Sequence, residues 1–274
     1  MNRLFVAYKP TGIGSNLFLS KLKRKYGCKK AGFSGTLDPF AKGCLIIGFG
    51  THTKLFRFLN KTPKKYRATL WLGAKSESLD TEMVEYVSIA KEFPRHKVAD
   101  AIKALEGRIT YDPPIFSAKK INGRRAYDLA RAGREFTLNK ITSTVYETRL
   151  LHYNHPFITF EATVSEGTYI RSLGRIISDK LGIKNSSLSA LERLNEGVFY
   201  YDKEKPLDIK KSLNIKQNRY NGDLKNIAYG RVLFVEDFQI KENGCYWIDN
   251  GDNISVIRIE DSKVTYELGR IYTS

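Results

Sequence analysis

Residues 30–56 read KAGFSGTLDPFAKGCLIIGFGTHTKLF, a glycine-rich loop followed by a run of apolar residues. The apolar run at 44–50 predicts a buried strand. Pro39 disfavours the helical region for Asp38, so the carboxylate is carried on a stiff, extended backbone. Three glycines surround it and leave room for a ligand or a second backbone: Gly32, Gly35 and Gly43. Asp-Pro turns between strands are common, so the loop alone indicates either a turn or a site that needs a rigid carboxylate.

Strands and helices alternate around this loop without the regular rhythm of a doubly wound fold. Expected strands are 4–8, 44–50, 66–73, 141–153 and 157–165. Expected helices are one that Ser15 or Asn16 caps and that runs to about Tyr26, one at 97–106 and one from near Tyr169. We therefore predict an α+β fold with a mixed, largely antiparallel sheet and flanking helices.

The remaining segments predict additions to this sheet. Residues 112–133 are polar, basic and rich in turn residues, which favours a mobile insertion over a core element. Residues 203–225 are charged and contain helix breakers, as a connector does. Short strands are expected beyond them, at 231–235, 245–248, 254–259 and 264–268. We predict a large domain at 1–225 and a small β unit at 226–274.

The composition excludes several classes of protein. The chain has 274 residues, of which 42% are hydrophobic and 12% aromatic, so it is a folded protein and not a disordered tail. It has no apolar run long enough for a membrane span and no signal peptide, which predicts a cytoplasmic protein. Cys28, Cys44 and Cys245 form no C-x-x-C pair and support neither disulfides nor a zinc site. The absence of Walker and G-x-G-x-x-G spacing argues against a nucleotide cofactor.

The net charge of +17 is unevenly distributed along the chain. Residues 236–274 carry a net charge of −4, so residues 1–235 carry +21. Basic residues cluster at 21–30, 61–67 and 119–134, and each cluster contains a tyrosine. Cations interleaved with aromatic rings suit nucleic acid, because phosphates contact the charges and unpaired bases stack on the rings. A solvated, lysine-rich surface is the alternative.

Arg171 lies in the opening turn of the helix expected from Tyr169. The helix dipole disfavours a cation there unless an anion lies close. If Asp38 is that anion, we expect bidentate hydrogen bonds between the two groups and a lowered pKa that keeps the aspartate ionised as a nucleophile. An ordinary surface arginine is the alternative interpretation.

Five blocks of this sequence together resemble one family. They are YKPTGIGSN (8–16), KAGFSGTLDPFAKGCLIIGFGTHTKLF (30–56), KKYRATLWLG (64–73), SEGTYIRSLGRIISDKLG (165–182) and LSALERL (188–194). In order and spacing they resemble the TruB family of bacterial tRNA pseudouridine synthases, over about three quarters of the chain. The resemblance implies the pseudouridine synthase fold and the isomerisation of uridine 55, in the T-psi-C arm of tRNA, to pseudouridine.

The resemblance also implies roles for individual residues. The family's catalytic aspartate matches Asp38, the nucleophile; the tyrosine that stacks on the target base matches Tyr66; and the arginine paired with the aspartate matches Arg171. The expected substrate-binding set comprises Leu191 in an apolar pocket, Phe33, Gly35 and Thr36 on the loop, and Lys9 and Pro10 of the KP motif that supports it. Residues 112–138 match an insertion that closes over the RNA stem-loop.

The chemistry of the family needs neither a metal nor an organic cofactor. His152 and His155, spaced as H-x-x-H, fall in a strand-like segment that would place them on opposite faces. The resemblance leaves open whether the aspartate attacks C6 of the uracil, attacks C1′ or removes a sugar proton.

Two positions depart from the family pattern. Phe33 stands where the family commonly has histidine, so a polar role there is lost. The C-terminal unit is short and acidic where the family has an RNA-binding PUA domain, so we expect a PUA-like β unit that contributes little to RNA binding.

Two rival functions remain at this point. One is a non-catalytic RNA binder or chaperone of the same fold, and the other is a synthase directed by a guide RNA. A carboxylate among phosphate-binding groups favours the enzyme, because like charges repel in a mere binder. The basic insertion favours direct binding of the tRNA stem-loop, without a guide RNA or an obligate protein partner.

Overall fold

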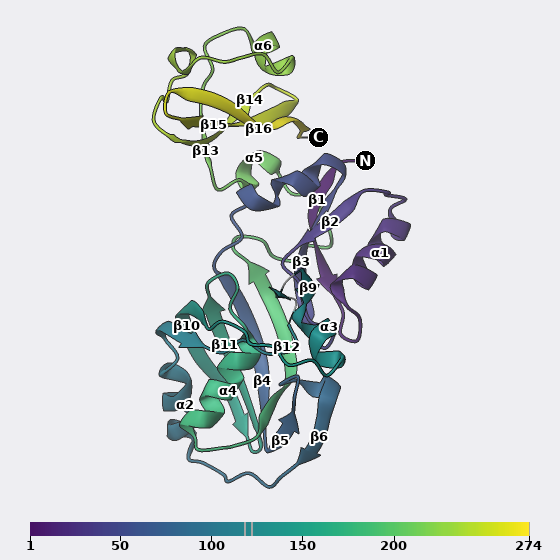
Figure 1. Ribbon diagram of the computed structural model, residues 1–274, viewed down its shortest axis with the longest axis vertical. Helices are drawn as coiled ribbons and strands as arrows, with labels where there is room; N and C mark the ends of the chain where they lie inside the picture. The colour runs from purple at the N-terminus through teal and green to yellow at the C-terminus, as the bar shows by residue number, and fades with distance from the viewer. Residues whose placement is uncertain (118, 122, 274) are drawn as a thin grey trace.

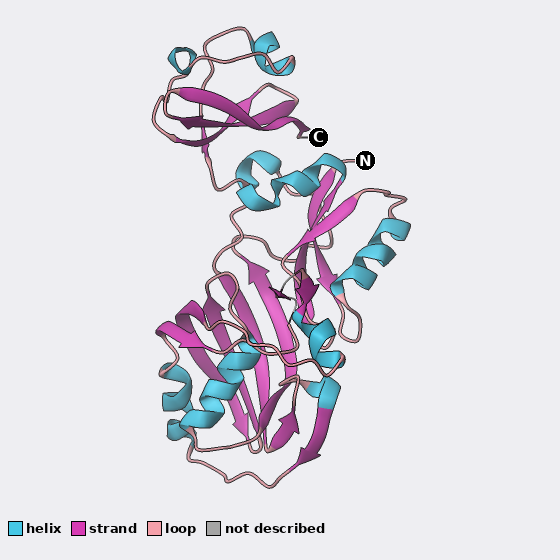
Figure 2. Ribbon diagram, viewed as in Figure 1, coloured by secondary structure: helices cyan, strands magenta, loops and turns pink. Residues whose placement is uncertain are grey.

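A large mixed sheet with flanking helices forms one end of the molecule, and a small sheet forms the other (Figures 1 and 2). The computed structural model describes residues 1–117, 119–121 and 123–273. Its two termini lie near each other, where the small unit meets the large one (Figure 1).

Seven strands form the main path of the large sheet. Their spatial order is β1 (Arg3–Lys9), β3 (Lys42–Phe49), β12 (Ser186–Glu196), β4 (Lys64–Leu72), β11 (Phe157–Val164), β10 (Ile141–Asn154) and β7 (Gly107–Tyr111), and β2 (Ala31–Ser34) pairs with β3. β12 runs parallel to β3, and the other pairings of these strands are antiparallel. The predicted α+β class and largely antiparallel sheet are confirmed.

The alternation of apolar residues in β4 explains how this sheet is covered. Tyr66, Ala68, Leu70 and Leu72 are buried, whereas Arg67, between Tyr66 and Ala68, is exposed. The buried face packs against α2 (Arg95–Lys103) and α4 (Ile170–Lys180) in one hydrophobic cluster. The helices expected at 97–106 and from near Tyr169 are therefore confirmed, as is the half-buried strand at 66–73.

β1 and β3 are buried on both faces, which accounts for their nearly continuous apolar sequence. Helix α1 (Ser15–Lys25) covers one face, with Phe18 and Leu22 in the same cluster as Leu45. The expected side-chain cap of this helix is wrong, because its N-cap is Gly14. The Ser15 hydroxyl instead donates to the Leu37 carbonyl at 2.9 Å and accepts from the Leu37 amide at 3.0 Å. Ser15 thus attaches the start of α1 to the residue before Asp38.

Several short elements connect the strands of the large unit. They are η1 (Gly50–Phe58), η2 (Thr81–Met83), α3 (Ala126–Arg131), the hairpin of β5 (Ala74–Ser76) with β6 (Val84–Val87), and the hairpin of β8 (Lys120–Ile121) with β9 (Arg124–Arg125). The β8–β9 hairpin and α3 lie in the predicted insertion at 112–138.

The small sheet contains β13 (Lys216–Gln217), β14 (Gly244–Asp249), β15 (Asn253–Glu260) and β16 (Lys263–Tyr272). α5 (Ile209–Ser212), α6 (Leu224–Ala228) and η3 (Val235–Asp237) accompany it. The last three expected strands are confirmed, but the one at 231–235 is wrong, because residues 231–234 carry no regular structure. β13 lies inside the segment expected to be a connector. The domain boundary at residue 225 stays a prediction.

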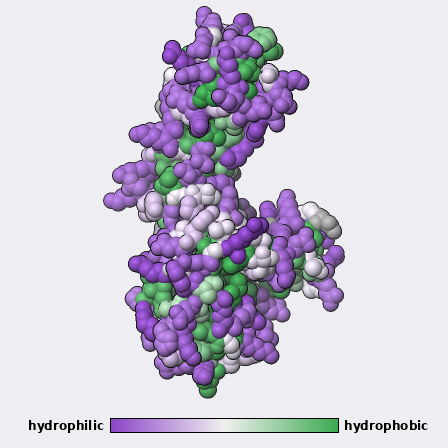
Figure 3. Space-filling model, turned by 90° about the vertical axis from the view of Figure 1, so that its left-hand side faces the viewer, coloured by the Kyte–Doolittle hydropathy of each residue, from purple (hydrophilic) through white to green (hydrophobic). Residues whose placement is uncertain are grey.

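One face of the small sheet shares a hydrophobic cluster with the large unit. Trp247, Ile254 and Ile271 share a hydrophobic cluster with Leu4 of β1 and Leu55 of η1. On the face of the molecule seen in Figure 3, hydrophobic residues appear as patches between larger hydrophilic areas. No helix within the described parts of the chain is long and apolar enough to cross a membrane.

The shared cluster predicts that substitutions in the small sheet destabilise the protein. Ile254 is fully buried, so Ile254→Ala should lower the free energy of unfolding by about 2–4 kcal/mol in urea denaturation. Val232, in the same unit, is 79% exposed. Val232→Ala should change the free energy by about 0.5 kcal/mol or less. Equal effects of the two substitutions would contradict the shared core.

Candidate active site

A cavity of about 270 Å³ lies where the β2–β3 loop, β4, the start of α4 and β12 meet. Six of the residues predicted from the sequence line it: Gly35, Thr36, Asp38, Tyr66, Arg171 and Leu191. These residues come from four separate segments of the chain, and the fold brings them to one place.

Gly35 adopts a backbone conformation that the loop requires. Its φ is +63°, and an added Cβ would lie 2.8 Å from Nζ of Lys64 and 3.3 Å from Nη1 of Arg193. Any larger residue would therefore strain the backbone and crowd two buried cations. The glycine lets the loop bring Asp38 close to β4 and β12.

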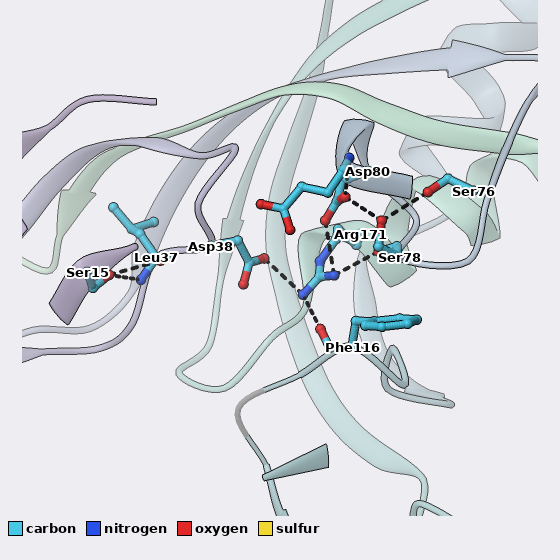
Figure 4. A network of polar contacts seen from close by, with 9 residues as sticks. Ser15, Leu37, Asp38, Ser76, Ser78, Asp80, Phe116 and Arg171 are labelled. Carbon is cyan, nitrogen blue, oxygen red and sulfur yellow. Dashed lines mark hydrogen bonds and ion pairs between the residues drawn. The ribbon is translucent and has the colours of Figure 1, made fainter. Parts of the chain in front are cut away.

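Arg171 and Asp38 form the ion pair that the sequence predicted (Figure 4). Arg171 lies in the first turn of α4, and its Nη2 is 3.0 Å from Oδ2 of Asp38. The expected bidentate geometry is wrong. The second terminal nitrogen, Nη1, instead lies 3.2 Å from Oδ2 of Asp80 and donates to the Ser78 carbonyl at 2.7 Å. Nη2 also donates to the Phe116 carbonyl at 2.9 Å, which connects the pair to the insertion.

Asp80 is a site residue that the sequence analysis missed. It is 2% exposed, and its Oδ1 accepts hydrogen bonds from the Ser78 hydroxyl and the Glu82 amide. The hydroxyls of Ser76 and Ser78 hydrogen-bond each other in the same network (Figure 4). The alternating S-x-S-x-D at 76–80 was the only sequence signal, and such a pattern occurs on many polar loops. Asp80 fixes the guanidinium that Asp38 contacts.

The pKa of Asp38 shifts in the direction opposite to the one expected. Burial raises the pKa of this carboxyl above its ordinary value, and the neighbouring Asp80 carboxylate raises it further. The charges of Arg171 and Lys9 oppose the rise without cancelling it. The site therefore holds a carboxylate that has lost much of its hydration, which makes it more reactive toward an electrophile or a proton.

Lys9 contacts the loop from behind. It is fully buried, and its Nζ donates to the carbonyls of Pro10 at 2.8 Å, Ile13 at 2.7 Å and Pro39 at 3.4 Å. Burial lowers the pKa of Lys9 to about 8, although the Asp38 charge opposes this. Lys9 and Pro10 do not line the cavity. Their position suits support of the loop on which Asp38 sits.

Phe33 also lies outside the cavity lining. It is half-buried on β2 and packs against the hydrophobic cluster between α1 and the edge of the sheet. An aromatic ring at this position fills apolar space, and it extends the face of the sheet that α1 covers.

The opposite wall of the cavity comes from the paired strands β4 and β12. Leu191 of β12 faces Ala68 of β4, and Tyr66 faces Arg193 in the same antiparallel ladder. Tyr66 and Leu191 are 9% and 6% exposed, so an aromatic ring and an aliphatic side chain shield the cavity beside the ion pair. Tyr169, the N-cap of α4, adds a second ring, and burial raises the pKa of its hydroxyl.

No group of three metal-ligating side chains occurs in residues 1–117, 119–121 and 123–273. His152 lies near the end of β10, and His155 lies in the turn before β11, not within a strand as expected. The Nδ1 atom of His155 is 3.3 Å from the hydroxyl of Tyr153.

Known proteins share both the sequence and the fold of this chain. The model of the TruB family pseudouridylate synthase (N terminal domain) matches residues 23–170. The tRNA pseudouridine synthase B of Sulfurimonas denitrificans is 70% identical over 271 residues, 99% of each chain. The enzyme of the same name from Sulfurovum is 53% identical and covers 99% of this chain and 98% of its own.

Two solved structures share the fold at low sequence identity. A Cbf5–Nop10–Gar1 complex matches with a TM-score of 0.70 and 21% identity, over 99% of this chain and 84% of the other. An H/ACA RNP bound to a substrate RNA containing 2′-deoxyuridine matches with a TM-score of 0.68 and 18% identity, over 99% of this chain and 85% of the other. The family model, the relatives that cover nearly the whole chain and the shared fold agree: this chain belongs to the TruB family of pseudouridylate synthases.

Proposed function

We propose that this protein isomerises uridine 55 in the T-psi-C loop of tRNA to pseudouridine. The observation that carries the proposal is the 3.0 Å ion pair of Asp38 and Arg171 in a cavity walled by Tyr66 and Leu191. The relatives described above bear the name tRNA pseudouridine synthase B, which supports tRNA as the substrate.

The reaction breaks the N1–C1′ glycosidic bond, forms a C5–C1′ bond, removes a proton from C5 and places one on N1. It involves no net oxidation or reduction, so one carboxylate and a water-excluding pocket supply what the chemistry needs. Asp38 is the nucleophile or base in this scheme. Tyr66 offers a ring face to a base taken out of its stack, and Leu191 keeps water from the detached uracil.

Arg171 and Asp80 control the state of Asp38. The guanidinium stabilises the carboxylate electrostatically, while burial and the second carboxylate keep its pKa above the ordinary value. The ionised form of a carboxylate held this way is a better nucleophile than a carboxylate in water, because it has lost much of its hydration. The order of attack on C6, C1′ or the sugar proton stays open.

The charge distribution supports tRNA binding through the large unit. The basic clusters lie in residues 1–235, and the β8–β9 hairpin of the insertion exposes Lys120 and Arg124. Direct binding of the T-arm through this hairpin needs no guide RNA. The PUA-like character of the small unit, its weak RNA contribution and the cytoplasmic location stay predictions.

Tritium release from tRNA carrying [5-³H]uridine tests the activity. The native protein should release tritium from T-arm substrates, and Asp38→Asn should abolish release because it removes the nucleophile while keeping the shape of the side chain. Asp202→Asn, at an exposed ion pair with Lys205, is the matched control and should leave the rate unchanged. If the folded native protein releases no tritium, the assignment as an enzyme is contradicted. Full activity of Asp38→Asn would contradict the role of Asp38.

The raised pKa of Asp38 predicts a pH dependence. Because the ionised form is the reactive one, kcat/KM should fall on acidification around a pKa above the ordinary aspartate value of about 3.9. Asp80→Asn removes a charge that raises this pKa, so the acid limb should move to lower pH. Movement of the limb to higher pH in this variant would contradict the assignment, and Asp202→Asn again serves as the control.

The surface that binds RNA is tested by two matched double substitutions. Lys120→Ala with Arg124→Ala should raise KM for the T-arm by about tenfold or more, leave kcat nearly unchanged, and reduce the salt slope of binding by about one per lost phosphate contact. Lys241→Ala with Lys263→Ala, in the acidic small unit, should change KM by less than about twofold. Equal effects of the two pairs would contradict the proposed division of charge.

A further inference from the structure

Arg193 is a buried cation beside the cavity that the scheme above does not use. It is 1% exposed and lies on β12, between the two strands that carry the site. In the parallel ladder it faces Gly43 of β3, and in the antiparallel ladder it faces Tyr66 of β4. Directly opposed residues in such a ladder have neighbouring side chains, so the guanidinium is adjacent to the Tyr66 ring.

The contacts of Arg193 connect both walls of the cavity. Its Nε donates to the Cys44 carbonyl at 2.8 Å, and its Nη2 donates to the Gly35 carbonyl at 2.9 Å. The same guanidinium faces the Tyr66 side chain across the ladder, and both residues line the cavity. One rigid, planar group thus sets the position of the aspartate loop relative to the tyrosine.

A buried carboxylate keeps this guanidinium in place. Oε1 of Glu196, which is fully buried, lies 2.9 Å from Nη2 of Arg193, and its Oε2 lies 3.2 Å from Nζ of Lys64. Burial alone would lower the pKa of Arg193, but Glu196 and Tyr66 more than offset this and raise it. The cation next to Tyr66 is therefore permanently charged.

A charged donor beside a tyrosine has a chemical consequence. A guanidinium has no acceptor atom, so a phenol beside it can only accept hydrogen bonds from it and must direct its own proton elsewhere, here toward the cavity. The positive charge also stabilises negative charge that develops on that oxygen. A hydrophobic residue at position 193 could fill the space, but it would leave the hydroxyl free to rotate.

We propose that Arg193, held by Glu196, is a positioning residue that directs the Tyr66 hydroxyl toward the base in the cavity. This role rests on the proposed isomerase activity. It acts on the step in which the C5 proton leaves, because Tyr66 stacks where that base must lie. The Gly35 contact makes the tyrosine and the aspartate loop a single rigid unit.

A double-mutant cycle on C5 tritium release tests the role, with enzyme in excess so that slow single turnovers can be quantified. Arg193→Lys keeps the charge that Glu196 needs but loses the planar fork, so kcat should fall about tenfold while KM changes less than about twofold. In the Tyr66→Phe background the same substitution should have less than about a twofold effect, because the hydroxyl on which it acts is gone. Arg258→Lys, at a partly exposed ion pair with Glu267 in the small unit, is the matched control and should stay within about twofold of the native rate.

The outcomes are distinct. An Arg193→Lys effect of equal size in both backgrounds overturns the positioning role while leaving the isomerase intact, whereas an inactive native protein overturns the isomerase itself. If Arg193→Lys does not fold, the isosteric Glu196→Gln takes its place in the cycle, with the same expected coupling and the same contrary result. In the folded variant, ¹⁹F NMR of 3-fluorotyrosine protein should show the Tyr66 signal shifted, and an unmoved signal also overturns the proposal.

Discussion

The position of one guanidinium, that of Arg171, determines the arrangement of the site. It lies in the first turn of α4, where a cation without an anion is unfavourable, and two carboxylates from different segments meet it. Asp38 comes from the loop before β3, and Asp80 from the segment after β5. A carbonyl of the insertion, that of Phe116, completes its contacts. The helix, the loop and the insertion are thus held together by one charge, and the cost of burying that charge is offset only while all of them are in place.

The two long strands β4 and β12 give this arrangement its stiffness. Each contributes two residues to the cavity wall, one of them a buried charge: Tyr66 and Lys64 from β4, and Leu191 and Arg193 from β12. β12 is also the strand that runs parallel to β3, so the aspartate loop and the tyrosine belong to one continuous sheet. Side chains on neighbouring strands keep their spacing better than side chains on separate loops, which suits a site that must hold a flipped base against a carboxylate.

The sequence predicted the elements whose apolar residues are regularly spaced or continuous and whose ends are marked by turn residues. Alternation identified β4, and apolar runs identified β1 and β3. The Asp-Pro loop and the helix dipole already suggested Asp38 and Arg171 as a possible pair, and the family resemblance added Tyr66, Leu191 and the expected roles. The structure places these four around one cavity. Their chemical roles remain proposals.

The features that the sequence did not predict depend on contacts between distant segments. Asp80 has no motif around it, and its importance arises only because α4 brings Arg171 against it. The pKa direction of Asp38 was predicted wrongly, because burial and a second carboxylate cannot be seen in one loop. The cap expected at Ser15 failed for a similar reason: its hydroxyl found the backbone of Leu37, 22 residues away in the chain. Arg193 looked like an ordinary charge in ALERL until the strand register placed it opposite Tyr66.

The contact between the small sheet and β1 and β3 has an evolutionary consequence. Trp247, Ile254 and Ile271 form part of the hydrophobic core that also contains Leu4 and Leu55. A lineage could therefore shorten, lengthen or recharge the outer loops of this unit freely, but it could not delete the unit or exchange it without also resurfacing β1 and η1. The small sheet and the large unit share buried side chains and should be retained together, while the surface that the small sheet turns to solvent is under no such packing constraint.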